Sequence, residues 1–357
     1  MSDFNFFLQS LRMKKKTVSI KTIAENLNIS VTTVSFVLNG KGKEKHISKE
    51  LTQKVLDYAK AVNYRPNQIA QSLRTGKSNI LVFMVEDISN SFFSKLARII
   101  EDIAYVKGYK VIFCSTENDD EKSIELISIF KYRQVDGFII VPSPGIKNVI
   151  QELIEENIPV VLLDRYFSDL DCNSVVIDNE EATFKATSHL ITNDFKNIGF
   201  VTTDSNQTQM RDRLLGYEKA VANFDLDPQI LRIPFIETSN GKAKAFIKKF
   251  INESNKLDAI FFATNYLAQT GLEVFKESAP HLIQDLGIIT FDDNELFKIY
   301  SPTITAVSQP LLKISNELMK LLLPLLKRKD VKEETKNILL NAELIIRESS
   351  RPKNKLS

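Results

Sequence analysis

The stretch "SIKTIAENLNISVTTVSFVLNG", residues 19–40, decides the fold of the amino-terminal part of the chain. It contains two short segments with apolar residues at helical spacing. These apolar positions are Ile20, Ile23, Ala24 and Leu27 in the first segment and Val34, Val37 and Leu38 in the second. Ser19 and Ser30 precede the segments as candidate N-caps, and Gly40 follows the second as a stop signal. The pattern predicts two helices joined by a tight turn around Asn28.

A third amphipathic helix is predicted over residues 48–62, and the module is strongly basic. The apolar face of this helix consists of Leu51, Val55, Leu56 and Ala59. Three short helices of this kind are typical of a helix-turn-helix module. From Arg12 to Lys77 there are 14 Lys and Arg residues against four Asp and Glu, a net charge of +10, so the remainder of the +2 chain carries −8. This asymmetry indicates that the basic module binds a polyanion, although charge alone fits a solvated lysine-rich surface equally well.

The second helix leaves mostly short side chains facing outward. They are Val31, Thr32, Thr33, Ser35 and Phe36. Short side chains can approach base edges and phosphates, and a helix N-terminus attracts phosphate. The lysines after Gly40 suit the flanking DNA backbone. These residues favour a DNA-binding helix over a structural helical hairpin without a ligand.

An ordered series of motifs makes the chain resemble the LacI/GalR family of bacterial transcription regulators. The series begins with "TIAENLNISVTTVSFVLNG" and "NYRPNQIAQSLRTGKSNILVFMVEDISNSFF". It continues through "DGFIIVPS", "IPVVLLDR", "DNEEATFKATSHLI", "RLLGYEKA" and "GIITFDDNELFKIYSPTITAV" to "IIRESS", so that it covers residues 17–350. The resemblance implies a helix-turn-helix domain, a hinge helix and a two-lobed effector domain.

The resemblance also implies which residues of the second helix contact DNA. Bases would be contacted by Val31, Thr32 and Phe36, and phosphates by Thr33, Ser35 and Asn39. Phe36 departs from the family, which usually has Arg there. Arg can contact guanine bidentately, whereas Phe offers only apolar contact, for example to a thymine methyl group. The alternative is that Phe36 packs inside the module, so the operator base at this position is left open.

Residues 65–77, "RPNQIAQSLRTGK", resemble the hinge helix of the family. The peptide begins next to a proline and ends in Thr-Gly, but it is too short to be a stable helix by itself. The resemblance implies that it folds when two copies meet on DNA, and that Leu73 wedges into the minor groove. Asn67, Gln71 and Arg74 would then lie near the DNA backbone or groove. The alternative is an ordinary basic linker with a core-facing leucine.

From Asn79 onward, strand-like and helix-like segments alternate. The strand-like segments "NILVFMV", "KVIFCS", "DGFIIV" and "PVVLLD" are separated by predicted helices at 92–107, 122–133 and 147–156. A second series runs from "NIGFVTT" through "AIFFAT" to "GIITFDD". This spacing predicts parallel sheets with helices on both faces. Two such α/β lobes resemble the periplasmic-binding-protein fold, in which the ligand lies between the lobes, beyond the carboxyl ends of the strands.

Polar residues at these strand ends are the predicted effector-binding residues. They are Asp87, Ser89, Asn90, Phe92, Asp164, Arg165, Arg213 and Asp292. Carboxylates and guanidinium groups can each take paired sugar hydroxyls, and Phe92 can stack on a sugar face. For any single residue a surface or lobe-bridging salt bridge is an equally good interpretation, and Arg213 and Asp292 are the best candidates. Thr264 and Asn265 stand where the family commonly has Asn-Asp, which leaves open an effector other than a simple hexose.

Other functional classes lack their motifs. We find no phosphate-binding loop, dinucleotide-binding fingerprint or nucleophile elbow, and the histidines are isolated in sequence: His46, His189 and His281. No enzyme activity, cofactor or metal site is therefore predicted; "ENDDE" at 117–121 lacks the Gly of an EF-hand loop. The two cysteines, Cys114 and Cys172, show no disulfide or metal spacing, which favours a reducing cytoplasm. No signal peptide or membrane segment is predicted.

These observations predict a cytoplasmic, homodimeric transcription regulator, a repressor that binds a palindromic DNA operator under the control of a sugar or sugar derivative. The predicted parts are a disordered extension at 1–16, with Met13 as an alternative start, a helix-turn-helix domain at 17–64, a hinge at 65–77, an effector-binding and dimerisation domain at 78–350, and a tail at 351–357. Within the effector domain, one lobe is predicted from 78–178 and 309–328, and the other from 179–308 and 334–350. The alternative is a solute-binding protein of the same fold, which would need export and would have no use for the basic module.

Overall fold

The structure is a computed structural model in which the chain forms two compact units, Met1–Ser78 and Asn79–Ser357. It describes residues 18–65, 76–239, 241–254, 257–327 and 334–352. The predicted extension at 1–16, its alternative start at Met13 and the tail beyond residue 352 lie outside the described residues. The same holds for the four predicted hinge contacts, Asn67, Gln71, Leu73 and Arg74.

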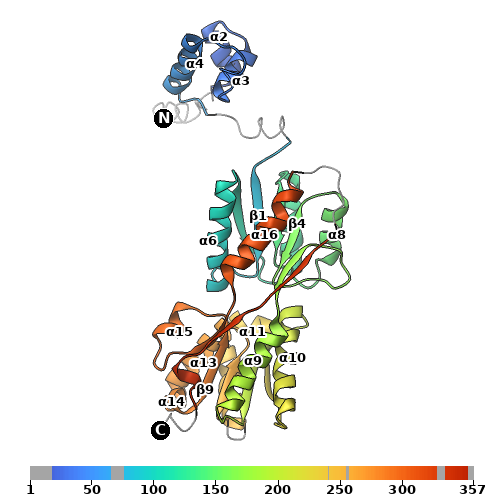
Figure 1. Cartoon of the computed structure of the whole chain (residues 1–357), viewed down its shortest axis with the longest axis vertical. Helices are drawn as coiled ribbons and strands as arrows, with labels where there is room; N and C mark the ends of the chain where they lie inside the picture. Colours follow the sequence, from blue (N-terminus) through green and yellow to red (C-terminus); the bar gives the residue numbers. More distant parts are fainter. Residues whose placement is uncertain (1–17, 66–75, 240, 255–256, 328–333, 353–357) are drawn as a thin grey trace, which may run out of the picture. The chain divides into compact units, whose positions relative to one another are not determined.

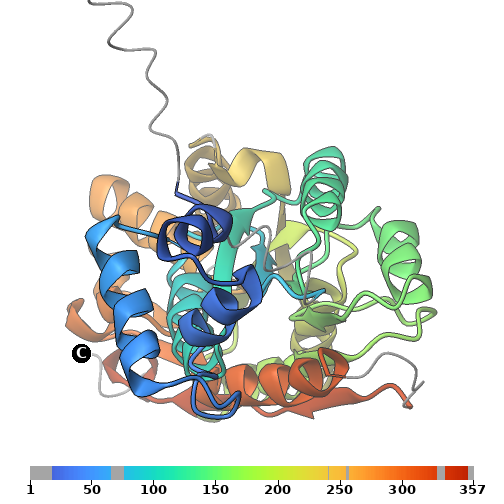
Figure 2. The ribbon, with the colours of Figure 1, turned by 90° about the horizontal axis from the view of Figure 1, so that it is seen from above.

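The described residues of the first unit, drawn in blue in Figures 1 and 2, form the helices α2 (Ile20–Leu27), α3 (Val31–Leu38) and α4 (Lys49–Ala61). A serine precedes each helix and accepts a hydrogen bond from the backbone N–H three residues on; these caps are Ser19, Ser30 and Ser48. Asn28 ends α2 in the left-handed conformation, with φ 53°, and turns the chain toward α3. The predicted helix-turn-helix fold is therefore confirmed.

The helices of the first unit enclose a small apolar core. Its fully buried members are Ile23, Ala24, Val34, Val37, Val55 and Ala59. The prediction that Leu56 belongs to this face is wrong, because its side chain is 42% exposed. Val55 and Ala59 are four residues apart and share the buried face of α4, whereas the next position is rotated away from that face.

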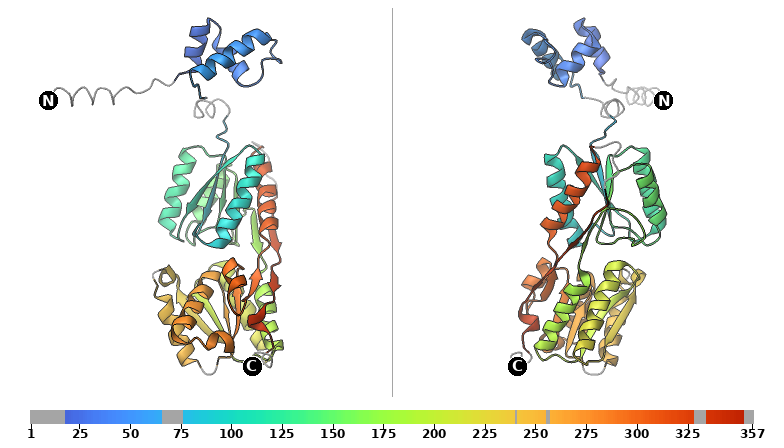
Figure 3. Two further views of the ribbon diagram at one scale, coloured as in Figure 1. Left: turned by 90° about the vertical axis from the view of Figure 1, so that its left-hand side faces the viewer. Right: turned by 45° about the vertical axis from the view of Figure 1, so that its right-hand side comes forward.

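The second unit contains two sheets of six strands each (Figures 1 and 3). The first sheet has the order β11-β5-β4-β3-β1-β2 and is parallel throughout. Its strands are β1 (Ile80–Val85), β2 (Lys110–Ser115), β3 (Gly137–Ile140), β4 (Val160–Leu163), β5 (Ser174–Ile177) and β11 (Asn337–Leu340). Apolar runs such as "ILVFMV" in β1 are typical of parallel strands that are covered on both faces.

The second sheet has the corresponding order β12-β10-β9-β8-β6-β7, in which only the β10/β12 pair among the described strands is antiparallel. Its strands are β6 (Ile198–Asp204), β7 (Gln229–Pro234), β8 (Ala259–Phe262), β9 (Gly287–Phe291), β10 (Thr305–Ser308) and β12 (Glu343–Ile345). Strand β9 thus holds the position in the second lobe that β4 holds in the first. The predicted architecture of two α/β lobes is confirmed.

Helices lie on both faces of the sheets (Figure 3). The first lobe has α6 (Ser91–Val106), α7 (Asp120–Tyr132), α8 (Lys147–Glu155) and α16 (Leu311–Leu325). The second has α9 (Asn179–Thr192), α10 (Thr208–Asn223), α11 (Phe235–Ser239), α12 (Ala243–Glu253), α13 (Asn265–Ser278), α14 (Leu282–Asp285), α15 (Glu295–Ile299) and the 3₁₀ helix η1 (Glu348–Ser350). One apolar cluster runs from α6 and α16 through to α9 and α10, and so joins the two lobes. Among the described residues, no helix combines the length and apolarity needed to cross a membrane.

The chain passes between the lobes after β5, β10 and β11. The last crossing corrects one prediction, namely that residues 334–350 belong to the second lobe as a whole. Asn337–Leu340 instead forms β11 and pairs with the edge strand β5 of the first sheet, and only then does the chain enter the second sheet as β12. The free edge of β5 decides this placement, because it offers a parallel ladder that local sequence does not reveal.

Candidate functional site

The predicted DNA-contacting residues lie on α3 and directly after it. Val31 is 45% exposed, Thr32 and Asn39 are also exposed, and Thr33, Ser35 and Phe36 are partly buried. Several of these side chains are tied to the helix itself. The Thr33 hydroxyl lies 2.8 Å from the Ser30 hydroxyl, and Asn39 Nδ2 donates to the carbonyl of Ser35 at 2.7 Å. The helix therefore presents a preorganised polar surface.

Phe36 is partly buried but lies apart from the apolar core of the first unit. It belongs neither to the apolar core nor to the partly buried residues packed against that core. The ammonium group of Lys45 lies over its ring, 5.5 Å from the centroid. Phe36 is therefore not part of the apolar core, although its side chain is partly buried.

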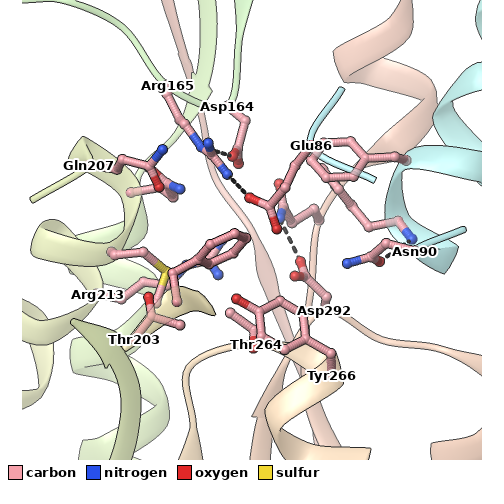
Figure 4. Close-up of a pocket in the computed structure, with 16 residues that line it drawn as sticks. Glu86, Asn90, Asp164, Arg165, Thr203, Gln207, Arg213, Thr264, Tyr266 and Asp292 are labelled. Atoms are coloured by element: carbon pink, nitrogen blue, oxygen red, sulfur yellow. Dashed lines mark hydrogen bonds and ion pairs between the residues drawn. The ribbon is translucent and has the colours of Figure 1, made fainter. Parts of the chain in front are cut away.

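A second candidate site is a cavity between the two lobes of the second unit (Figure 4). Its volume is about 30 Å³, and the space free of protein atoms reaches about 430 Å³ when the part open to solvent is included. Seven predicted effector residues line it: Asn90, Phe92, Asp164, Arg165, Arg213, Thr264 and Asp292. The other predicted residues, Asp87, Ser89 and Asn265, line a larger neighbouring pocket that opens to solvent. Asp87 accepts hydrogen bonds from the backbone and the hydroxyl of Ser89, at 2.8 and 2.6 Å, and so shapes a turn at this pocket.

Arg165 is buried at one side of the cavity and is surrounded by acceptors. Its Nη2 pairs with the carboxylate of Glu86, and its Nη1 donates to the side-chain oxygen of Asn118. Its Nε lies 3.4 Å from a carboxylate oxygen of Asp164. Asn118 also donates to Glu86 at 2.8 Å, which closes a network of three side chains. Because its partners fix the guanidinium, Arg165 can orient Glu86 and Asp164 toward a ligand.

Arg213 occupies the opposite side, on the first turns of α10. Its Nε donates to the side chain of Asn179 at 2.9 Å, and its Nη1 donates to the carbonyl of Ala263 at 2.8 Å. The guanidinium carbon also lies 3.6 Å from the ring centroid of Phe291. This buried cation is therefore held by two hydrogen bonds and one aromatic face.

Asp164 and Asp292 occupy equivalent positions in the two lobes. Each directly follows its strand, β4 or β9, and each has a left-handed backbone, with φ 67° and 69°. Burial raises the pKa of both carboxyl groups, against the lowering effects of Arg165 and Arg213 on Asp164 and of Arg213 on Asp292. Gln309 donates to Asp292 at 2.6 Å. The two lobes thus aim matched acceptors into one cavity (Figure 4).

Asn90 and Asn265 face each other across the lobes. Asn265 Nδ2 donates to Asn90 Oδ1 at 2.9 Å, and Asn90 Nδ2 donates to Asn265 Oδ1 at 3.3 Å. Asn90 Oδ1 also accepts from the N–H of Phe92 as the N-cap of α6. Thr264 accepts from the N–H of Leu267 as the N-cap of α13. Of the two residues that differ from the family's usual Asn-Asp, Thr264 therefore caps a helix and Asn265 links the two lobes.

The sequence did not reveal several residues of this cavity. They are Glu86, Phe93, Thr203, Gln207, Gln209, Met210, Phe235, Tyr266 and Gln309. The strand-end argument could have found Glu86, which follows β1, and Gln309, which follows β10. Gln207 and Tyr266 lie at the starts of helices, where that argument gives no signal.

Taken together, the cavity holds three carboxyl groups and two guanidinium groups beside several aromatic rings. Such a set can take paired hydroxyl groups of a small ligand, with the rings against its apolar faces. Within the described part of the chain, no cluster of three or more His, Cys, Asp or Glu residues is arranged to hold a metal ion.

Comparison with known proteins finds a matching family for a segment of each unit. Residues 19–67 match the family described as "Bacterial regulatory proteins, lacI family", and residues 187–350 match "Periplasmic binding protein-like domain". The chain is 33% identical over 336 residues to the HTH-type transcriptional regulator RegA of Clostridium saccharobutylicum, covering 93% of this chain and 99% of that protein. The chain belongs to the LacI family of bacterial regulatory proteins.

Other LacI-family proteins cover similar shares of the chain. The ribose operon repressor of Halalkalibacterium halodurans is 28% identical over 333 residues, covering 93% of this chain and 97% of the repressor. The crystal structure of the Lac repressor dimer bound to operator and the anti-inducer ONPF has a TM-score of 0.80 at 22% identity, covering 94% of this chain and all of that one, and so shows a common fold. As a LacI-family member, the protein is a DNA-binding transcription regulator with a periplasmic-binding-protein-like domain.

Proposed function

We propose that the protein is a repressor that binds a palindromic operator as a homodimer, and that a sugar or sugar derivative bound between the lobes controls it. The proposal of a sugar ligand rests on one observation. Two buried carboxyl groups, of Asp164 and Asp292, lie in the same cavity between the lobes as the guanidinium groups of Arg165 and Arg213. Paired, fixed donors and acceptors of this kind suit vicinal hydroxyl groups. The ribose operon repressor among its relatives agrees with this ligand class.

On the DNA side, we assign α3 to the major groove. Val31, Thr32 and Phe36 would face base edges, and Thr33, Ser35 and Asn39 would face phosphates. The exposure of this surface and family membership support the assignment. The proposal extends to a hinge at 65–77, in which Leu73 opens a base step while Asn67, Gln71 and Arg74 lie beside it.

Control would operate by a shift between two populations of lobe arrangements. A ligand that binds one arrangement more tightly than the other changes the fraction of protein that can hold two half-sites of DNA. The Lac repressor, which shares this fold and was crystallised as a dimer bound to operator, agrees with a dimeric complex. The proposed role needs no catalysis, and its place is the cytoplasm, where the DNA is.

Retention of genomic DNA fragments by the purified protein tests this function. We expect enrichment of a palindrome, lost or strengthened when the matching sugar is added. Binding should weaken steeply with salt, by a factor on the order of 10³ or more between low and physiological salt if several phosphates are contacted. Retention of no palindrome, with or without candidate sugars, would favour a ligand-binding role without DNA.

A further inference from the structure

The segment that follows α3 is a folded loop. The N–H of Lys41 donates to the carbonyl of Phe36 at 2.8 Å, and the N–H of Lys45 donates to the carbonyl of Lys41 at 3.0 Å. At its far end, the N–H of Ile47 donates to the carbonyl of Gly42 at 2.9 Å, and the Ile47 side chain packs against the core of the first unit. The position of the Lys45 backbone is therefore fixed relative to α3.

This loop brings a cation to the ring of Phe36. Lys45 Nζ lies 5.5 Å from the ring centroid, within the range of a cation–π interaction. The neighbouring Glu44 carboxylate lies 3.6 Å from the same ammonium group, but both side chains are largely exposed, so this ion pair is weak. The contact with the Phe36 ring directs the Lys45 ammonium group toward α3, whereas the contact with Glu44 stays within the loop.

Phe36 lies on the same face of α3 as Thr32, because the two are four residues apart on one helix. Thr32 is exposed, and Phe36 is not part of the core. The ammonium group of Lys45 is therefore held beside the surface that we assign to the bases. The helix α3 itself carries no positive charge, since "VTTVSFVL" contains no Lys or Arg. The Lys45 ammonium group therefore supplies a positive charge beside this helix.

We propose that Phe36 and Lys45 form one base-reading unit, in which the ring positions the ammonium group to contact guanine O6 and N7 in the major groove. Lysine can make this contact, and a ring beneath the cation limits the directions in which it can point. Phe36 is then a positioning residue and Lys45 a specificity-determining residue. The inference rests on the proposed binding of α3 in the major groove.

Selection from randomised DNA tests the unit with four single variants of the full chain. Lys45→Met removes the cation and keeps the stem, and Phe36→Leu removes the ring and stays apolar. Lys45→Arg keeps the positive charge. Lys43→Met is the matched control, because it removes the same charge from the same loop, and the structure shows Lys45 rather than Lys43 over the Phe36 ring.

For the wild-type protein we expect one enriched guanine in each half-site. Lys45→Met and Phe36→Leu should each lower the preference for that guanine by roughly tenfold, while Lys45→Arg retains it. Lys43→Met should weaken binding to all sequences equally, as expected for a phosphate contact, and leave the preference unchanged. Thermal unfolding of each variant confirms that the first unit remains folded.

Two outcomes would overturn the inference while leaving operator binding intact. In the first, Lys45→Met weakens binding to all sequences equally, as we expect for Lys43→Met. In the second, Phe36→Leu alone alters a preference for thymine, which would mean that the ring contacts a thymine methyl group without help from Lys45. If the wild-type protein enriches no sequence, the proposed operator binding fails, and this inference fails with it.

Discussion

Asp164 and Asp292 are carboxyl groups that are buried in the cavity between the lobes, where burial raises the pKa of each. Burial raises the pKa of Asp292 above its ordinary value of 3.8, although Arg213 and Gln309 act in the opposite direction. The folded state therefore holds the proton more tightly than the unfolded state does. It follows that stability is greatest when the carboxyl is protonated, and falls as the pH rises through the folded-state pKa.

Asp292→Asn should accordingly stabilise the ligand-free protein at neutral pH. The amide oxygen can still accept the hydrogen bond from Gln309, while the buried charge is gone. We expect a higher Tm at neutral pH, a smaller loss of Tm between acidic and neutral pH, and a ligand affinity lowered by roughly tenfold to a hundredfold. Thermal unfolding across pH measures the first two, and a lower Tm of the variant at neutral pH would contradict the argument.

Arg213→Met should be much more damaging, because the buried Arg213 makes two hydrogen bonds and lies against the ring of Phe291. Its removal withdraws the donors from Asn179 and Ala263 and takes away the positive charge that lowers the pKa of Asp292. We expect the free energy of unfolding to fall by about 3 kcal/mol, as measured by urea denaturation.

The neighbouring Arg211 gives a matched control for this change. It lies on the same helix and loses the same charge in Arg211→Met, but its side chain is 62% exposed and pairs with the adjacent Asp212. The expected change is within about 0.5 kcal/mol. Similar losses for the two variants would mean that net charge, rather than the buried contacts of Arg213, determines the effect.

Among the elements, those with local signals could be predicted from the sequence. Ser19 and Ser30 cap α2 and α3 as expected, because a cap depends on residues only three positions apart. Strand β11 could not be assigned to its lobe, since its place depends on the free edge of β5. For the cavity, the sequence predicts Asp164 and Asp292 because each directly follows a buried strand. It does not predict Asn118, which contacts Arg165 from a loop distant in sequence.

The packing of α10 against α9 gives an element-scale prediction. A Cβ atom at Gly216 would lie 2.2 Å from the backbone carbonyl oxygen of Glu180 in α9. Gly216→Ala should therefore force the two helices apart and destabilise the protein by about 1 to 3 kcal/mol. Helix propensity alone predicts the opposite change, because alanine in place of glycine within a helix would stabilise the protein by about 1 kcal/mol.

The control for this substitution is Leu215→Ala at the adjacent position, where the side chain is 37% exposed. Urea denaturation of both variants separates close helix contact from propensity. A Gly216→Ala variant as stable as the wild-type protein would show that α9 and α10 can move apart without loss.

At the scale of the whole second unit, side-chain pairs connect the lobes across the cleft. Asn90 pairs with Asn265, Gln207 Nε2 donates to Asn118 at 3.3 Å, and Lys95 lies 3.5 Å from Glu295. The Lys95–Glu295 pair is exposed to solvent and contributes little. The Asn90–Asn265 pair is reciprocal and partly buried, so we expect it to contribute most to the closed arrangement.

Asn265→Asp tests that contribution by removing a donor and keeping the shape. The new carboxylate would face Asn90 Oδ1, which cannot turn away without losing its hydrogen bond to the N–H of Phe92 at the start of α6. Loss of one such hydrogen bond, about 1 kcal/mol, shifts the balance between closed and open lobes about fivefold toward the open form. We expect a larger radius of gyration by X-ray scattering of the ligand-free protein. As a control, Gln269→Glu makes the same amide-to-acid change in the same pocket and should leave the scattering unchanged. Identical scattering curves for Asn265→Asp and the wild-type protein would contradict the prediction. They would show that the apolar cluster shared by the lobes holds them closed without the Asn90–Asn265 pair.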